Sequence, residues 1–103
     1  MKNRNPLRSL FVAFLTFLPA STLVAGQKDK TLDIYWIDVE GGGATLIVTP
    51  EDESILIDTG NPGVRDPERI HHVITQVAGL KQLDHMIITH WHSDHFGGAA
   101  EIA

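Results

Sequence analysis

The sequence has 103 residues, enough for one domain or part of one, and its 43% apolar and 20% charged residues do not indicate a disordered chain. It has no cysteine, so disulfide bridges and thiolate metal ligands are excluded, and any metal must be held by nitrogen and oxygen donors. From residue 27 onward there are five basic and thirteen acidic residues, a formal charge of −8, which argues against a strong nucleic-acid-binding patch.

The first 26 residues have the layout of a secretory signal peptide. Three basic residues lie in the first eight positions, an apolar run follows at residues 10–18, and a segment rich in small residues ends at Gly26. As a helix the apolar run would span roughly 14 Å, well short of the roughly 30 Å of a hydrocarbon core. We therefore predict a signal peptide at residues 1–26, a secreted or periplasmic protein, and no membrane span in the mature part. An uncleaved membrane anchor and an amphipathic amino-terminal helix are the alternatives.

Three strands are expected at the start of the mature part. Alternating apolar residues and many β-branched and aromatic side chains predict strands at residues 31–38, 44–49 and 54–58. The stretches VEGGG and PEDE between them are typical of tight turns, so the three strands are expected to form an antiparallel meander. The triple glycine is not a phosphate-binding loop, because no lysine follows it and the next segment is a strand.

A helix is expected next, with Asp66 as its cap and Pro67 at its first position. Gly79 is expected to end it. His71 and His72 are expected at the surface. Apolar residues at helical spacing predict one buried stripe, which consists of Ile70, Val73, Ile74, Val77 and Ala78.

A fourth strand is expected at residues 85–89, and its continuously apolar centre predicts burial on both faces. His85, which opens this strand, is expected to be packed or partly exposed rather than to bind a metal. The stretch GGAAEIA near the end of the chain is typical of the start of another helix. The element order is therefore βββ-α-β-loop-α, an α/β (α+β) class.

The stretch THWHSDHFGG follows the fourth strand and carries the spacing His-x-His-x-Asp-His. An extended chain directs residues i and i+2 to the same side, so His90 and His92 can bind one metal ion, while Trp91 points away and is expected to pack. Asp94 and His95 follow where the chain turns and can bind a neighbouring ion. Imidazole and carboxylate groups are zinc ligands, and two such ions a few ångströms apart suit hydrolysis.

Chance is a poor explanation of this spacing. With six histidines and eight aspartates in the chain, the probability that it arises at random is on the order of 10⁻³. A polar loop with capping histidines is the alternative, but the position directly after an apolar strand argues against it.

The stretch resembles the signature Thr-His-x-His-x-Asp-His-x-Gly-Gly of the metallo-β-lactamase-fold hydrolases. Upstream, ILIDTG resembles an earlier strand-end motif of that family, with Asp58 at its aspartate. The resemblance covers residues 32–103. It implies an αββα sandwich, of which residues 27–103 are the amino-terminal half, cut after the first metal-binding motif.

Within the superfamily, the opening strand is most similar to the metallohydrolase domain of ComEC-type competence proteins. Asp38, Val39 and Ala44 fit that pattern. The glycine turn departs from the usual Gly-Gln-Gly-Asp sequence at three positions, and such a turn borders the active site. This difference in the turn affects the prediction of the substrate more than the prediction of the fold.

The resemblance implies a hydrolase with two zinc ions, iron or manganese being possible instead. It implies that His90 and His92 bind the first ion, and that Asp94 and His95 bind the second. Asp94 is also implied as the catalytic residue that orients a metal-bound hydroxide. Asp58 is implied to hold the loop and a ligand histidine in place.

The attacked bond is implied to be a phosphodiester or an ester- or amide-type bond in a small molecule, with a phosphodiester favoured and lactone, lactam and thioester left open. The remaining ligands are expected beyond Ala103, so the chain by itself is expected to be inactive or nearly so. A non-catalytic extracytoplasmic metal-binding or interaction module and a di-iron redox site are the alternatives. The sequence leaves the oligomeric state open.

Overall fold

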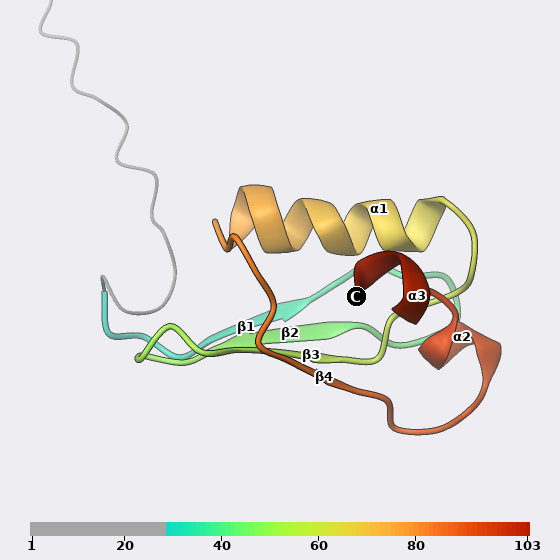
Figure 1. Ribbon diagram of the computed structural model, residues 1–103, viewed down its shortest axis with the longest axis horizontal. Coiled ribbons are helices and arrows are strands. Elements are labelled where there is room, and N and C mark those ends of the chain that lie inside the picture. The colour runs from blue at the N-terminus through green and yellow to red at the C-terminus, as the bar shows by residue number, and fades with distance from the viewer. Residues whose placement is uncertain (1–28) are drawn as a thin grey trace, which may run out of the picture.

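The computed structural model describes residues 29–103, so the expected signal peptide lies outside the described residues. One four-stranded sheet carries a longer helix over one face and two short helices at the end where that helix begins (Figure 1). The expected mixed α/β architecture is confirmed. The elements are β1 (Asp33–Trp36), β2 (Thr45–Val48), β3 (Ser54–Ile57), α1 (Arg65–His72), its π-helical continuation η1 (Val73–Val77), β4 (His85–Ile87), α2 (Ser93–Phe96) and α3 (Ala99–Ile102).

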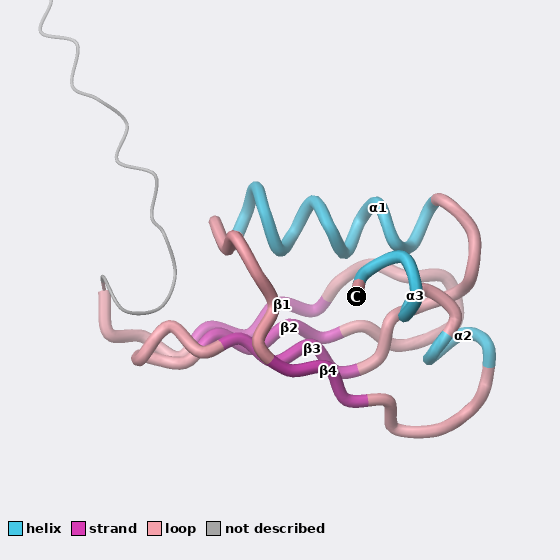
Figure 2. Tube along the Cα trace, viewed as in Figure 1, coloured by secondary structure: helices cyan, strands magenta, loops and turns pink. Residues whose placement is uncertain are grey.

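The sheet order is β1-β2-β3-β4 (Figure 2). The pairs β1–β2 and β2–β3 are antiparallel, which confirms the expected meander, and β4 returns parallel to β3 after the helical crossover. Parallel pairing aligns Ile57 with Ile87, so both strands end at the same edge of the sheet. The residues after β3 and the residues after β4 therefore meet there.

The hydrophobic core lies between the sheet and α1. Leu46 and Leu56 from the central strands are fully buried, as is Ile70 from the helix. Alternate strand residues point to this side, because successive side chains in a strand face opposite ways. The core holds the crossover against the sheet and so fixes the edge at which β3 and β4 end.

The helical stripe is confirmed at Ile70, Ile74 and Ala78, which are all buried, but the prediction for Val77 is wrong. Val77 is 47% exposed. The cause is the π-helical turn of η1, in which the N–H of Ala78 donates to the carbonyl of Val73. This turn contains one residue more than an α-helical turn, so Val77 rotates away from the core. Gly79 has φ +70° and ends the helix as expected.

Asp66 is not the helix cap, which corrects the sequence-based expectation. The helix begins at Arg65, so Asp66 lies inside its first turn. Its carboxylate, only 3% exposed, accepts hydrogen bonds from the backbone and side chain of Asn61 and from Arg65. Burial acts to raise the pKa of Asp66, but these hydrogen bonds outweigh burial and hold the pKa below its usual range.

The lowered pKa of Asp66 predicts a loss of stability in acid. Its contribution is fully present above the unfolded-state pKa of about 3.9 and is lost as the pH falls through the lower folded-state pKa. We expect Asp66→Asn to lower the free energy of unfolding at pH 7 by about 2 kcal/mol, and this difference to shrink at pH 3. Urea unfolding at both pH values measures it, with Asp52→Asn on an exposed turn as the reference. An equal difference at both pH values would contradict the prediction.

The outer face of the sheet is apolar and open among the described residues. β4 was expected to be buried on both faces, and this is wrong: Ile87 is 50% exposed, and only Met86 turns towards the core. The reason is that α1 covers one face of the sheet only. Trp36, on the same outer face, is 81% exposed. The apolar residues that the pleat directs outward are Ile34, Trp36, Ile47, Ile55, Ile57 and Ile87.

Candidate metal site

Asp58 follows β3 directly and anchors the site. Its N–H donates to the carbonyl of Ile87 at 2.8 Å, which extends the pairing with β4. Its carboxylate accepts from the N–H of Thr89 at 2.8 Å and from the hydroxyl of Thr89 at 2.7 Å. The residue has φ +61°, a left-handed conformation that aspartate tolerates better than most residues. The carboxylate thus joins the ends of β3 and β4.

The Asp58 carboxylate is held in its charged form. Burial acts to raise its pKa, and the side chain is only 8% exposed. The hydrogen bonds from the backbone N–H of Thr89, the imidazole of His95 and the hydroxyl of Thr89 outweigh burial and lower the pKa. The result is a fixed acceptor at the centre of the site.

His95 is oriented by this acceptor. Its Nδ1 lies 2.8 Å from Oδ2 of Asp58, and an ionised carboxylate can only accept, so Nδ1 carries the hydrogen. The lone pair of Nε2 is then free to bind a metal. The carbonyl of His95 accepts from the backbone N–H and the hydroxyl of Thr59 at 2.7 and 3.1 Å. Ring and backbone are both fixed.

The same carboxylate also sets the tautomer of His90. The hydroxyl of Thr89 has one hydrogen, which it donates to Asp58. Its oxygen, 3.0 Å from Nδ1 of His90, is therefore the acceptor of an Nδ1–H group. Nε2 of His90 is then free as well. Sequence reasoning missed this role of Thr89, although the residue opens the quoted stretch.

The three histidines of the motif lie together. The ring centroid of His90 is 4.7 Å from that of His92 and 3.9 Å from that of His95. Oδ2 of Asp94 is 3.8 Å from Nε2 of His95. His92 is extended and Asp94 and His95 belong to α2, a short helix that the sequence did not predict. The structure therefore gathers all five residues named from the sequence, Asp58 included.

The donor types and the histidine tautomers of these residues suit a metal ion, but their grouping does not complete a site. The ring nitrogens that face away from the Asp58 network are free, and nitrogen and carboxylate donors suit zinc, iron or manganese. Within residues 29–103, however, no three His, Asp or Glu side chains are grouped so as to hold one ion. The described residues thus offer donors of suitable chemistry but do not by themselves form a complete coordination shell.

The glycine loop, residues 39–43 between β1 and β2, packs against the motif. The N–H of Gly43 donates to the carbonyl of Asp94 at 3.2 Å. A Cβ on Gly42 would lie 1.8 Å from that same carbonyl oxygen, and one on Gly43 would lie 3.2 Å from Nδ1 of His95. The triple glycine was predicted only as a turn. Its lack of side chains is what lets the motif approach.

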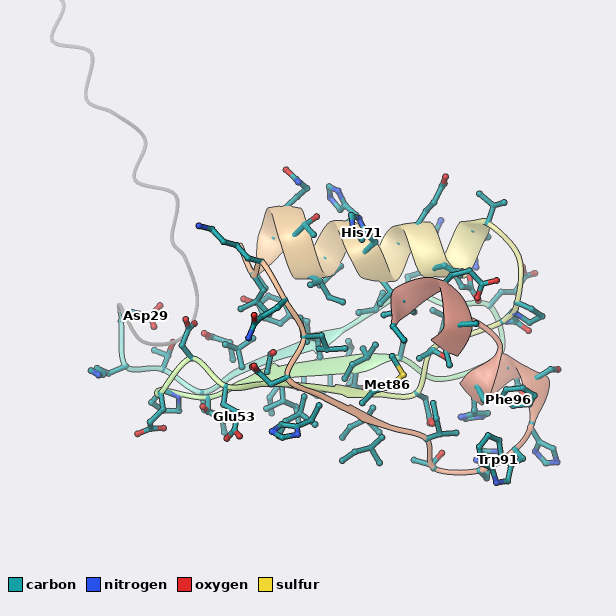
Figure 3. The ribbon with its side chains drawn as sticks, viewed as in Figure 1. Asp29, Glu53, His71, Met86, Trp91 and Phe96 are labelled. Carbon is teal, nitrogen blue, oxygen red and sulfur yellow. The ribbon has the colours of Figure 1, made fainter. Side chains whose placement is uncertain are left out.

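Three other side chains take no part in the hydrogen bonds of this cluster. His71 is exposed on α1, as expected, and points away from the sheet (Figure 3). His85 is exposed and pairs with Glu53 at 2.8 Å. Trp91 was expected to pack, but it is 80% exposed, and its ring lies beside that of Phe96 with centroids 5.6 Å apart. The side of the motif that carries Trp91 is therefore exposed to solvent within the described residues.

A separate hollow of about 710 Å³ lies along α1, between the helix and the end of β1. Its two arginines are already paired. Arg69 donates to the carbonyl and carboxylate of Asp38, and Arg65 lies 3.9 Å from the same carboxylate. The hollow therefore offers no free basic patch.

Comparison with known proteins identifies the family of the chain. Residues 38–103 match the family model described as the metallo-beta-lactamase superfamily. This match covers more than half of the chain, and the chain belongs to the metallo-beta-lactamase superfamily.

Curated relatives carry hydrolase names. A UPF0173 metal-dependent hydrolase of Koribacter versatilis is 41% identical over 76 residues, covering 70% of this chain and 27% of the relative. Another, of Cupriavidus metallidurans, is 35% identical over 82% of this chain and 26% of the relative. An atrochrysone carboxyl ACP thioesterase of Aspergillus fumigatus is 39% identical over 59% of this chain and 14% of its own length. The chain thus spans about a quarter or less of these relatives. No solved structure matches it significantly.

Proposed function

We propose that the chain contributes the first metal-binding motif of a two-zinc hydrolase. In this proposal His90 and His92 bind one ion, and Asp94 and His95 bind the other. The observation that carries it is the hydrogen bond from Nδ1 of His95 to Asp58, because this bond leaves Nε2 free beside the carboxylate of Asp94. A metal ligand histidine commonly donates its other nitrogen to a carboxylate in this way.

Each residue then has a defined task. Asp58 holds the tautomers of His95 directly and of His90 through Thr89. Asp94, at 33% side-chain exposure, accepts a hydrogen from the attacking water and orients it. When bound, zinc lowers the pKa of a coordinated water towards 7 and polarises a carbonyl or phosphoryl oxygen.

The proposed substrate is a small molecule with a phosphodiester bond. The similarity of the opening strand to ComEC-type domains supports it. A thioester is the second candidate, supported by the name of the Aspergillus fumigatus relative. Residues 1–26 are proposed to export the protein, and nothing in residues 29–103 forms a helix with the length and hydrophobicity that a bilayer span needs.

We further propose that the 103-residue chain by itself binds metal weakly and does not turn over substrate. The support is that the described residues group fewer than three donors around any one ion position. The same observation favours the alternative of a non-catalytic metal-binding module. A di-iron redox site on this fold is the third candidate.

Metal binding and turnover test the proposal together. We expect the 103-residue chain to bind Co²⁺ or Zn²⁺ above micromolar concentrations, and His92→Ala and Asp94→Ala to weaken binding at least tenfold. His71→Ala, on the exposed face of α1, is the control and should bind as wild type. In a longer reading frame that includes residues beyond 103, both site variants should lose hydrolysis of a bis-aryl phosphodiester.

Three outcomes would overturn parts of the proposal. Hydrolysis that survives both site substitutions would show that the assigned residues are wrong. Submicromolar binding of two zinc ions with turnover by the 103-residue chain would refute its inactivity. Metal binding by the longer protein with no hydrolysis of phosphodiester, thioester, lactone or lactam would favour the binding module.

A further inference from the structure

Asn61 lies where three segments of the chain meet. Its backbone N–H donates to Oδ2 of Asp66 at 2.9 Å, and its side-chain Nδ2 donates to the same oxygen at 3.1 Å. Nδ2 also donates to the carbonyl of Glu40 in the glycine loop. An amide nitrogen has two hydrogens, so both bonds can form at once. The side chain thus links the first turn of α1 to the glycine loop.

Asp66 fixes the orientation of this amide. Its carboxylate is buried in the first turn of α1, where the packing of the helix sets its position. The carboxylate accepts only, so Asn61 must present its N–H groups to it. The backbone of Gly60 packs closely against these groups, since a Cβ there would lie 2.9 Å from both Asp66 and the side chain of Val39.

The glycine loop transmits this constraint to the motif. The carbonyl of Gly43 accepts from the N–H of Gly60 at 2.9 Å, and the N–H of Gly43 donates to the carbonyl of Asp94. Residues 41–43 have no side chains that could hold the loop by packing, and glycine has a large conformational freedom to lose. The position of the loop therefore depends on hydrogen bonds at its two ends, of which Asn61 supplies one.

We propose that Asn61 is a positioning residue of the candidate metal site: it fixes the glycine loop through the carbonyl of Glu40, and the loop fixes the turn that carries Asp94 and His95. The inference rests on the proposed function, because it concerns the same ligands. Without the amide the loop samples more conformations, and metal binding must then order it, which lowers the affinity.

Asn61→Ala and Arg65→Ala form a matched pair for the test in the full chain. Arg65 also contacts Asp66, but it does not bond to the glycine loop. The first readout is hydrogen exchange of the Gly43 amide in metal-free protein, which reports the bond to Asp94. We expect exchange about tenfold faster in Asn61→Ala and unchanged in Arg65→Ala. Asn61→Ser replaces the alanine variant if that one does not fold.

The second readout is Co²⁺ affinity, measured from the visible absorption of the bound ion. We expect about tenfold weaker binding in Asn61→Ala and wild-type binding in Arg65→Ala. Unchanged exchange at Gly43, or faster exchange with unchanged affinity, overturns the role of Asn61. A wild-type chain that binds no Co²⁺ overturns the proposed function instead, and the exchange at Gly43 alone then decides whether Asn61 holds the loop.

Discussion

Asp58→Ala is expected to weaken Zn²⁺ or Co²⁺ binding 10- to 100-fold, which is the usual effect of losing the carboxylate behind a ligand histidine. The substitution removes the acceptor of three hydrogen bonds, two from Thr89 and one from His95. Nδ1 of His95 and, through Thr89, Nδ1 of His90 then lose the partner that fixes their tautomers. We also expect a loss of about 3 kcal/mol in the free energy of unfolding, because the donors are left without an acceptor.

Cobalt titration, urea unfolding and nitrogen NMR of the imidazoles measure these effects. Asp84→Ala is the matched control, because this carboxylate likewise accepts bonds from the backbone and hydroxyl of Ser54 but lies at the opposite end of the sheet. It should lower stability and leave metal affinity unchanged. If both variants weaken metal binding equally, Asp58 acts only through stability and the tautomer argument fails.

Gly42→Ala is expected to disrupt the site with the smallest possible side chain. The added Cβ would lie 1.8 Å from the backbone oxygen of Asp94, so the loop or α2 must move. Because both contacting parts are backbone, no side-chain rotation relieves the clash. We expect a loss of about 2–3 kcal/mol in the free energy of unfolding and at least tenfold weaker Co²⁺ binding.

Gly41→Asn is the control for the loop. Gly41 has open space around its Cα and φ +68°, a conformation that asparagine tolerates. This variant should stay within about 1 kcal/mol of wild type and bind metal normally. Wild-type stability and affinity in Gly42→Ala would show that the loop does not press against the motif.

The outer face of the sheet exposes large apolar side chains. Trp36 is 81% and Ile87 50% exposed, and exposed apolar patches are typical of surfaces that bind another protein, a membrane or a ligand. The superfamily resemblance implies a sandwich of two sheets, and the curated relatives are roughly four times as long as the matched region. Within residues 29–103, β4 is buried on one face only, because its outward residue Ile87 is 50% exposed.

The local patterns of the sequence determined the strands, the crossover helix and the histidine motif. Alternation and helical spacing report burial over a few residues, and His90, His92, Asp94 and His95 lie within six positions of one another. Their grouping therefore needs only a strand end and a turn. The same patterns missed Val77, because they assume a regular helix, and η1 is not one.

Only the tertiary structure decided which distant groups serve the motif. The partner of His95 lies 37 positions away, and the two meet because β3 and β4 pair in parallel and end at one edge. Asp66 is a residue type that often caps helices, yet its carboxylate accepts hydrogen bonds from Asn61. The triple glycine is typical of a turn, yet it also packs against the backbone of Asp94. Hydrogen-bond partners and close approaches across the fold depend on how elements pack, and no short-range periodicity encodes that.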